Sequence, residues 1–196
     1  MGMAKSDTGG KGMRLRVAGA LIVGLAATFV AGTCAAGDSY YGLSVSGGTQ
    51  WHGDPIWYVT DKYDWWYLSV RPLVGIHRTE RWDLWLEGNL TYVALEDDPD
   101  SLELGATGMT SYDFFAGRGW GLFGELGVGL GWMSDTPDEH ILGTGILGFF
   151  DYGLGIKVKT DSGMIVKLGP RFHHRSGLFR DDAGMNTYGV MLSVAR

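Results

Sequence analysis

Residues 119–133 read GWGLFGELGVGLGWM, and this stretch decides the fold. Its residues alternate between two faces, as the side chains of a β-strand do. The second face carries Phe123, Glu125 and several glycines. The first face is long and apolar, with a tryptophan near each end: Trp120, Leu122, Leu126, Val128, Leu130 and Trp132. The pattern predicts a strand with one large apolar face and one small, partly polar face.

Seven other runs show similar patterns, and the composition supports a fold made of strands. The chain has 33 glycines and 13% aromatic residues, which suit strands and tight turns better than helices. Charged side chains fall on the face opposite the large apolar residues, where we expect them to form ion pairs: Glu87, Glu125, Asp151, Lys167 and Arg171. The eight predicted strands lie roughly at 39–50, 64–77, 80–95, 102–116, 119–133, 142–158, 163–176 and 185–195.

Two kinds of barrel fit eight such strands, and the aromatic residues distinguish them. In a soluble lipocalin-like barrel the apolar faces would point inward. Here the apolar faces carry Trp or Tyr near their ends, and the opposite faces mix glycine with charged residues. A lipid-facing exterior with aromatic girdles and a narrow polar interior has this pattern. The sequence therefore predicts an all-β fold, an eight-stranded antiparallel up-and-down transmembrane β-barrel.

The predicted connections alternate in length. Those at 51–63, 96–101, 134–141 and 177–184 are longer, and those at 78–79, 117–118 and 159–162 are tight. Outer-membrane barrels have short periplasmic turns and longer external loops. We therefore expect the barrel to begin on the periplasmic side of the cell outer membrane, with every longer connection outside.

The N-terminal region resembles a targeting segment. Four basic residues precede an apolar run at 17–30, and small residues around Cys34 suit cleavage. We expect residues 1–36 to be a signal peptide and residues 37–196 to form the barrel domain, although a lipoprotein with Cys34 as its acylated residue is an alternative. Removal of residues 1–36 leaves 12 Lys and Arg against 21 Asp and Glu, a formal charge of −9. This acidic balance argues against nucleic acid as a partner.

Candidate catalytic residues occur in the last two predicted strands. By alternation, His174 and Ser176 share the apolar, outward face of their strand, and Asn186 lies on the same face of the next strand. An imidazole that accepts the proton of a serine hydroxyl makes that serine a nucleophile, and a third polar group orients the imidazole. The simpler alternative is that these are interfacial polar residues at the end of a barrel strand.

The second half of the chain resembles a known family. The resemblance rests on Gly124–Gly129, Leu142–Thr144 with Phe149–Gly155, Arg171–Ser176 and Gly184–Gly189. These segments resemble the PagL-type lipid A 3-O-deacylases, also described as an acyloxyacyl hydrolase family. The resemblance implies an outer-membrane barrel that hydrolyses the 3-O-linked acyl ester of lipid A, the membrane anchor of lipopolysaccharide, by a serine mechanism on the outside of the barrel.

The resemblance also implies a role for each site residue. Ser176 would be the nucleophile and His174 the general base. The family's orienting acid aligns, after a two-residue gap, with Asn186, and Asp181 or Asp182 is an alternative for that role. The family commonly has Asn after the serine, where this chain has Gly177, so the backbone N–H groups of Gly177 and Leu178 would form the oxyanion hole.

No cofactor or metal is expected, since the remaining histidines, His52, His77 and His140, have no spacing typical of a metal site. Two functions of different class fit the sequence. One is a lipid A esterase of the outer leaflet, and the alternative is a non-catalytic small barrel, structural or adhesive, that keeps the family outline. A homodimer is compatible with either.

Overall fold

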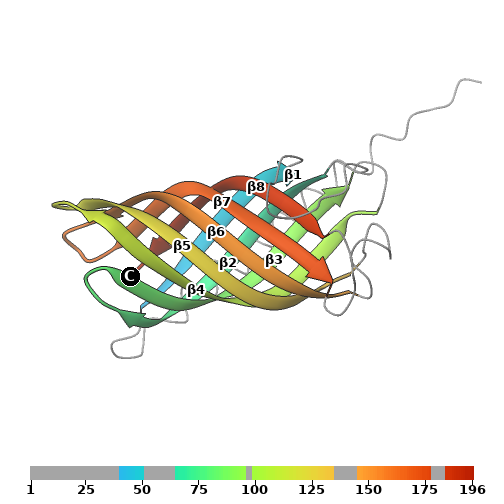
Figure 1. Cartoon of the computed structure of the whole chain (residues 1–196), viewed down its shortest axis with the longest axis horizontal. Helices are drawn as coiled ribbons and strands as arrows, with labels where there is room; N and C mark the ends of the chain where they lie inside the picture. The colour runs from blue at the N-terminus through green and yellow to red at the C-terminus, as the bar shows by residue number, and fades with distance from the viewer. Residues whose placement is uncertain (1–39, 51–64, 96–98, 135–144, 178–183) are drawn as a thin grey trace, which may run out of the picture.

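The computed structural model describes residues 40–50, 65–95, 99–134, 145–177 and 184–196, which form one closed barrel (Figure 1). Every strand pairs antiparallel with its sequence neighbours, and β1 pairs with β8 to close the barrel. The predicted eight-stranded up-and-down fold is therefore confirmed. The strands are β1 (Tyr41–Gln50), β2 (Trp65–Arg78), β3 (Trp82–Leu95), β4 (Ser101–Ala116), β5 (Trp120–Met133), β6 (Ile146–Lys159), β7 (Ile165–Gly177) and β8 (Met185–Ala195).

The two ends of the barrel differ, as the connection lengths predict. Residues 79–81, 117–119 and 160–164 make tight turns that gather at one end, where the C-terminus also lies (Figure 1). We call this the turn end. The longer connections, residues 51–64, 96–100, 134–145 and 178–184, join the strands at the opposite end, which we call the loop end.

The outward face is the apolar one. Leu122, Leu126 and Leu130 are 43%, 54% and 60% exposed, whereas Glu125 between them is 3% exposed. This arrangement is the reverse of a soluble barrel and confirms that the chain presents its apolar residues to lipid.

The even-numbered residues point outward through most of β2–β8, with exceptions at two register shifts. The shift between Gly75 and His77 leaves both Ile76 and His77 exposed and turns Arg78 inward, where it binds Asp83. The shift between Asp113 and Phe115 places both Phe114 and Phe115 outside.

A network of ion pairs fills the middle of the barrel. Arg171 contacts Glu87 at 2.9 Å and Glu125 at 2.5 Å. Arg71 contacts Asp151 at 2.8 Å and Glu87 at 3.5 Å. All five side chains are buried, and they come from β2, β3, β5, β6 and β7. The predicted pairing of the interior charges is confirmed, and it links strands that are not neighbours.

Apolar side chains close the interior on either side of this network. Trp65, Leu147 and Phe149 belong to a buried cluster at the loop end, and Trp85 belongs to another near the turn end. A polar cavity of about 450 Å³ opens at the turn end itself.

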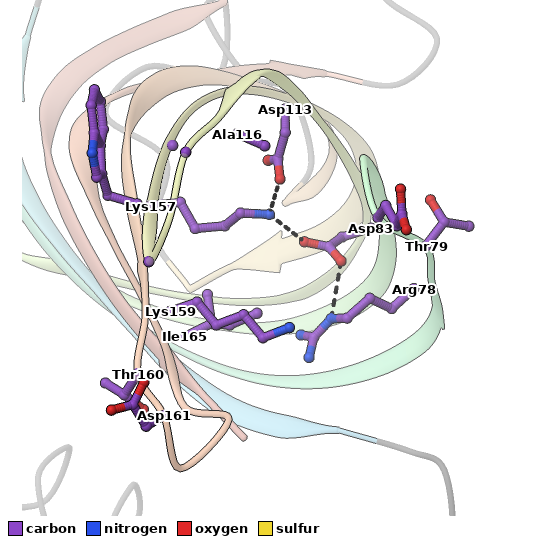
Figure 2. A pocket seen from close by; sticks show the side chains of 15 residues that line it. Arg78, Thr79, Asp83, Asp113, Ala116, Lys157, Lys159, Thr160, Asp161 and Ile165 are labelled. Carbon is purple, nitrogen blue, oxygen red and sulfur yellow. Dashed lines mark hydrogen bonds and ion pairs between the residues drawn. The ribbon is translucent and has the colours of Figure 1, made fainter.

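Charged side chains also pair across that cavity. In Figure 2, Lys157 lies between Asp113 and Asp83, and Asp83 also accepts a hydrogen bond from Arg78 at 3.0 Å. The described interior is therefore packed rather than open along its length.

The described part of the chain contains no helix long and apolar enough to cross a membrane. The predicted signal peptide, residues 1–36 with Cys34, lies outside the described residues.

Replacement of Arg171 by methionine tests the interior network. The substitution leaves the carboxylates of Glu87 and Glu125 buried with fewer partners, and breaking a buried pair costs about 3–5 kcal/mol. Urea unfolding of the folded barrel in lipid vesicles should show a loss of this size. The matched control is Leu168→Met on the lipid face of the same strand, which should change stability by less than about 0.5 kcal/mol. Equal stability of the two variants would show that the network contributes little.

Candidate active site

Two of the predicted catalytic residues, His174 and Asn186, meet where β7 and β8 pair at the loop end. His174 is the direct partner of Asn186 in the ladder, and Arg175 is the partner of Met185. The His174 Nδ1 atom lies 2.5 Å from Oδ1 of Asn186. An amide oxygen only accepts hydrogen bonds, so Nδ1 is the donor and Nε2 of the neutral ring is the acceptor. A histidine that acts as a base toward a neighbouring hydroxyl needs this tautomer.

Ser176 lies two residues beyond His174 on the same outward face of β7. It is partly exposed, and its partner across the β6–β7 ladder is Gly148. Gly148 therefore contributes no side chain beside Ser176 on the outward face of β6. Gly177 ends β7 and is also partly exposed. Leu178, Asp181 and Asp182 lie outside the described residues.

The histidine is buried although it is on the lipid-facing side. His174 is 6% exposed and Asn186 is fully buried. Phe150 is the partner of His174 on β6, and the neighbouring Phe172 stacks on Tyr152 with ring centroids 4.5 Å apart. The His174–Asn186 pair is thus excluded from water, and the low dielectric around the pair strengthens its hydrogen bond.

Gly184 packs directly against the imidazole. Its φ of +66° favours glycine, and a Cβ atom built there would lie 2.6 Å from Cε1 of His174 and 2.8 Å from the carbonyl oxygen of Arg175. A larger residue would have to displace the ring or the strand. The residue types alone do not indicate this role, because the contact exists only when β7 and β8 pair.

Thr187 holds the two strands together on the inner side of the site. Its hydroxyl donates to the carbonyl oxygen of His173 at 3.1 Å and accepts from Nη1 of Arg175 at 3.1 Å. Arg175 also pairs with Glu103 on β4, and His173 Nδ1 lies 3.0 Å from Asp151. His173 and Arg175 therefore face inward, and their contacts fix the orientation of β7. The role of Thr187 was missed because it depends on strand register.

No group of three or more His, Cys, Asp or Glu residues that could bind a metal ion occurs in the described ranges. The chemistry of the described site is that of an imidazole, an amide and a hydroxyl.

Comparisons with known proteins identify the family. The model of the family "Lipid A 3-O-deacylase (PagL)" matches residues 39–195. A search of curated protein sequences found no match.

Two solved structures share the fold. The crystal structure of the outer membrane enzyme PagL is 21% identical with a TM-score of 0.55, covering 78% of this chain and 97% of that one. The crystal structure of Neisserial surface protein A is 12% identical with a TM-score of 0.56, covering 81% of this chain and 98% of that one.

The barrel, with its apolar outer face and polar interior, agrees with the family match, which covers every described strand. The chain therefore belongs to the lipid A 3-O-deacylase (PagL) family, and it is a β-barrel of the cell outer membrane.

Proposed function

We propose that the chain is a serine esterase that removes the 3-O-linked acyl chain from lipid A in the outer leaflet. The observation that carries the proposal is the contact between Nδ1 of His174 and Oδ1 of Asn186, with Ser176 on the same outward face. Family membership supplies the substrate class.

The location of the site suits a substrate that stays in the membrane. The longer connections mark the loop end as the external end. Residues 174, 176 and 186 lie at this end on the outer surface of the barrel, so an ester at the base of a lipid A headgroup reaches them without leaving the bilayer. A substrate that had to enter the barrel would be blocked by the packed network of ion pairs.

The proposed reaction begins with proton transfer from Oγ of Ser176 to Nε2 of His174 as Oγ attacks the ester carbonyl carbon. The backbone N–H groups of Gly177 and Leu178 would stabilise the oxyanion. Collapse of the tetrahedral intermediate breaks the bond to the sugar oxygen, which receives the proton from His174. Water, activated by His174, then hydrolyses the acyl-enzyme and releases the fatty acid.

Asn186 would act as the orienting group in place of a carboxylate. Its oxygen holds the imidazole by accepting from Nδ1, but a neutral amide stabilises the imidazolium that forms during the reaction less than a negative charge does. The full burial of Asn186 partly offsets this difference, since the hydrogen bond is stronger where water is excluded.

Ser176→Ala tests the function itself. Mass spectrometry of lipid A from cells that express the wild-type chain should show loss of one 3-O-linked hydroxyacyl chain, and the Ser176→Ala variant should leave lipid A intact. The variant barrel should still fold, because Ser176 lies at the end of its strand. If the wild-type chain leaves lipid A unchanged, the alternative of a non-catalytic barrel holds.

Asn186 variants test the orienting role. Asn186→Leu keeps a side chain of similar size but removes the acceptor, so kcat should fall by about 10²- to 10⁴-fold. Asn186→Asp places a carboxylate in the same space and should retain or raise kcat. Asp181→Ala and Asp182→Ala are the comparison variants. If one of these abolishes deacylation while Asn186→Leu remains fully active, an aspartate has the orienting role.

Gly184→Ala tests whether close packing positions the base. The added methyl group would meet Cε1 of His174 and shift the ring away from its hydrogen-bonding position. We expect kcat to fall by at least ~10-fold, since small displacements of a catalytic group are costly. The matched control is Gly163→Ala in the β6–β7 turn, which also has positive φ but meets nothing within 4 Å and should leave kcat unchanged. Equal kcat in both variants would refute the positioning role.

A further inference from the structure

A groove of about 530 Å³ crosses the lipid-facing surface over β3–β6. Gly124 and Leu126 of β5 line the groove, and the absence of a side chain at position 124 lets the Phe114 ring lie close against the strand there. The volume is within the range of about 300–1,000 Å³ typical of ligand sites. An apolar hollow on a surface that faces lipid accommodates a hydrocarbon chain.

Aromatic side chains form both walls. On one side Trp82, Tyr112 and Phe114 make a continuous row, with ring centroids 4.8 Å and 5.7 Å apart. On the other side Phe150 and Tyr152 of β6 have centroids 6.0 Å apart. The walls are rigid compared with aliphatic side chains, so the groove is largely preformed.

A cation stands at one end of this groove. Arg81, in the tight turn between β2 and β3, donates from Nη1 to the Tyr112 hydroxyl at 3.3 Å. Its carbonyl oxygen accepts a hydrogen bond from the Asp113 backbone at 2.9 Å, which fixes the turn. The guanidinium is exposed, and within the described residues it forms no ion pair, even with Glu80 beside it. Arginine binds phosphate oxygens well because of its planar fork of donors.

We propose that this groove is a binding site for a glycerophospholipid of the periplasmic leaflet. The phosphate would bind Arg81 at the turn end, which is the periplasmic end of the barrel. One acyl chain would extend along Gly124 and Leu126 between the aromatic walls. The site is separate from the proposed esterase site, and it does not depend on that function.

The positive charge of Arg81 at the turn end favours a phospholipid of the periplasmic leaflet over other occupants of the groove. Lipid A has its charged headgroup in the outer leaflet, on the opposite side of the membrane from Arg81, so it cannot place a phosphate there. A second copy of this chain could bring the exposed Glu80 or Asp161 of its own turns to Arg81, and the experiment below separates that outcome from a bound lipid. A phospholipid of the periplasmic leaflet can place an acyl chain in the groove and its phosphate beside Arg81.

The experiment is native mass spectrometry of the detergent-solubilised full barrel titrated with phosphatidylglycerol. Arg81→Gln removes the charge, and Arg118→Gln in the neighbouring turn is its matched control. Gly124→Met fills the base of the groove, where the added atoms meet the end of the Phe114 ring at 2.7 Å. Gly108→Met is the control for that change, because it adds the same side chain on the lipid face outside the groove, where the nearest atom to the new Cβ would be the Val128 carbonyl oxygen at 3.8 Å.

One phosphatidylglycerol should remain bound to the wild-type chain and to both controls. Arg81→Gln should weaken its binding about five-fold, the effect of one cation near a lipid headgroup, and Gly124→Met should weaken it at least as much. Equal effects of Arg81→Gln and Arg118→Gln would overturn the proposal. A parallel titration with purified lipid A gives a second test: if Gly124→Met abolishes binding of lipid A but leaves binding of phosphatidylglycerol unchanged, the proposal is overturned. It is also overturned if the wild-type chain is a dimer and the Gly124→Met variant is a monomer.

Discussion

Hydrocarbon offers no hydrogen-bond partner to a peptide group, and the rest of this structure depends on that constraint. A sheet in lipid must close, because an open edge would leave a row of unpaired N–H and C=O groups. Here β1 pairs with both β2 and β8, so no strand of the barrel has an open edge. Closure of eight strands gives a narrow interior, and the alternation of side chains then sends every second residue into it.

The inward residues in turn determine what the outward residues can do. On β7, Arg171, His173 and Arg175 are each held inside by carboxylates from other strands. A rotation of β7 about its axis would break these contacts, so Phe172, His174 and Ser176 must point outward. The buried ion pairs inside the barrel thus orient the candidate catalytic residues on its outer face, although the paired side chains do not contact those residues. The hydrogen bonds of Thr187 stabilise the β7–β8 register in which Asn186 lies beside His174.

Much of this arrangement could be predicted from the sequence because a period of two is visible in the residue types. The alternation at 119–133 indicated which face meets lipid, and the strand limits agree with the structure to within a few residues. The inward charges and the shared face of His174, Ser176 and Asn186 follow from the same rule.

Features that depend on register or on non-local packing could not be predicted. The bulge that turns Phe115 outward interrupts the period without a signal in the residue types. The contact of Gly184 with the imidazole requires the pairing of β7 with β8. The groove combines side chains of four strands, so no single run of sequence contains its pattern.

The central claim is that a histidine on the outer surface of the barrel activates Ser176. Labelling with a fluorophosphonate, which reacts with activated serines, tests this most directly when followed by peptide mass spectrometry of the folded barrel. The account predicts a single adduct on the peptide that contains Ser176, lost in a His174→Ala variant and retained in a His173→Gln variant that folds. An adduct at Ser176 that persists without His174, or an active wild-type barrel that forms no adduct, would contradict it.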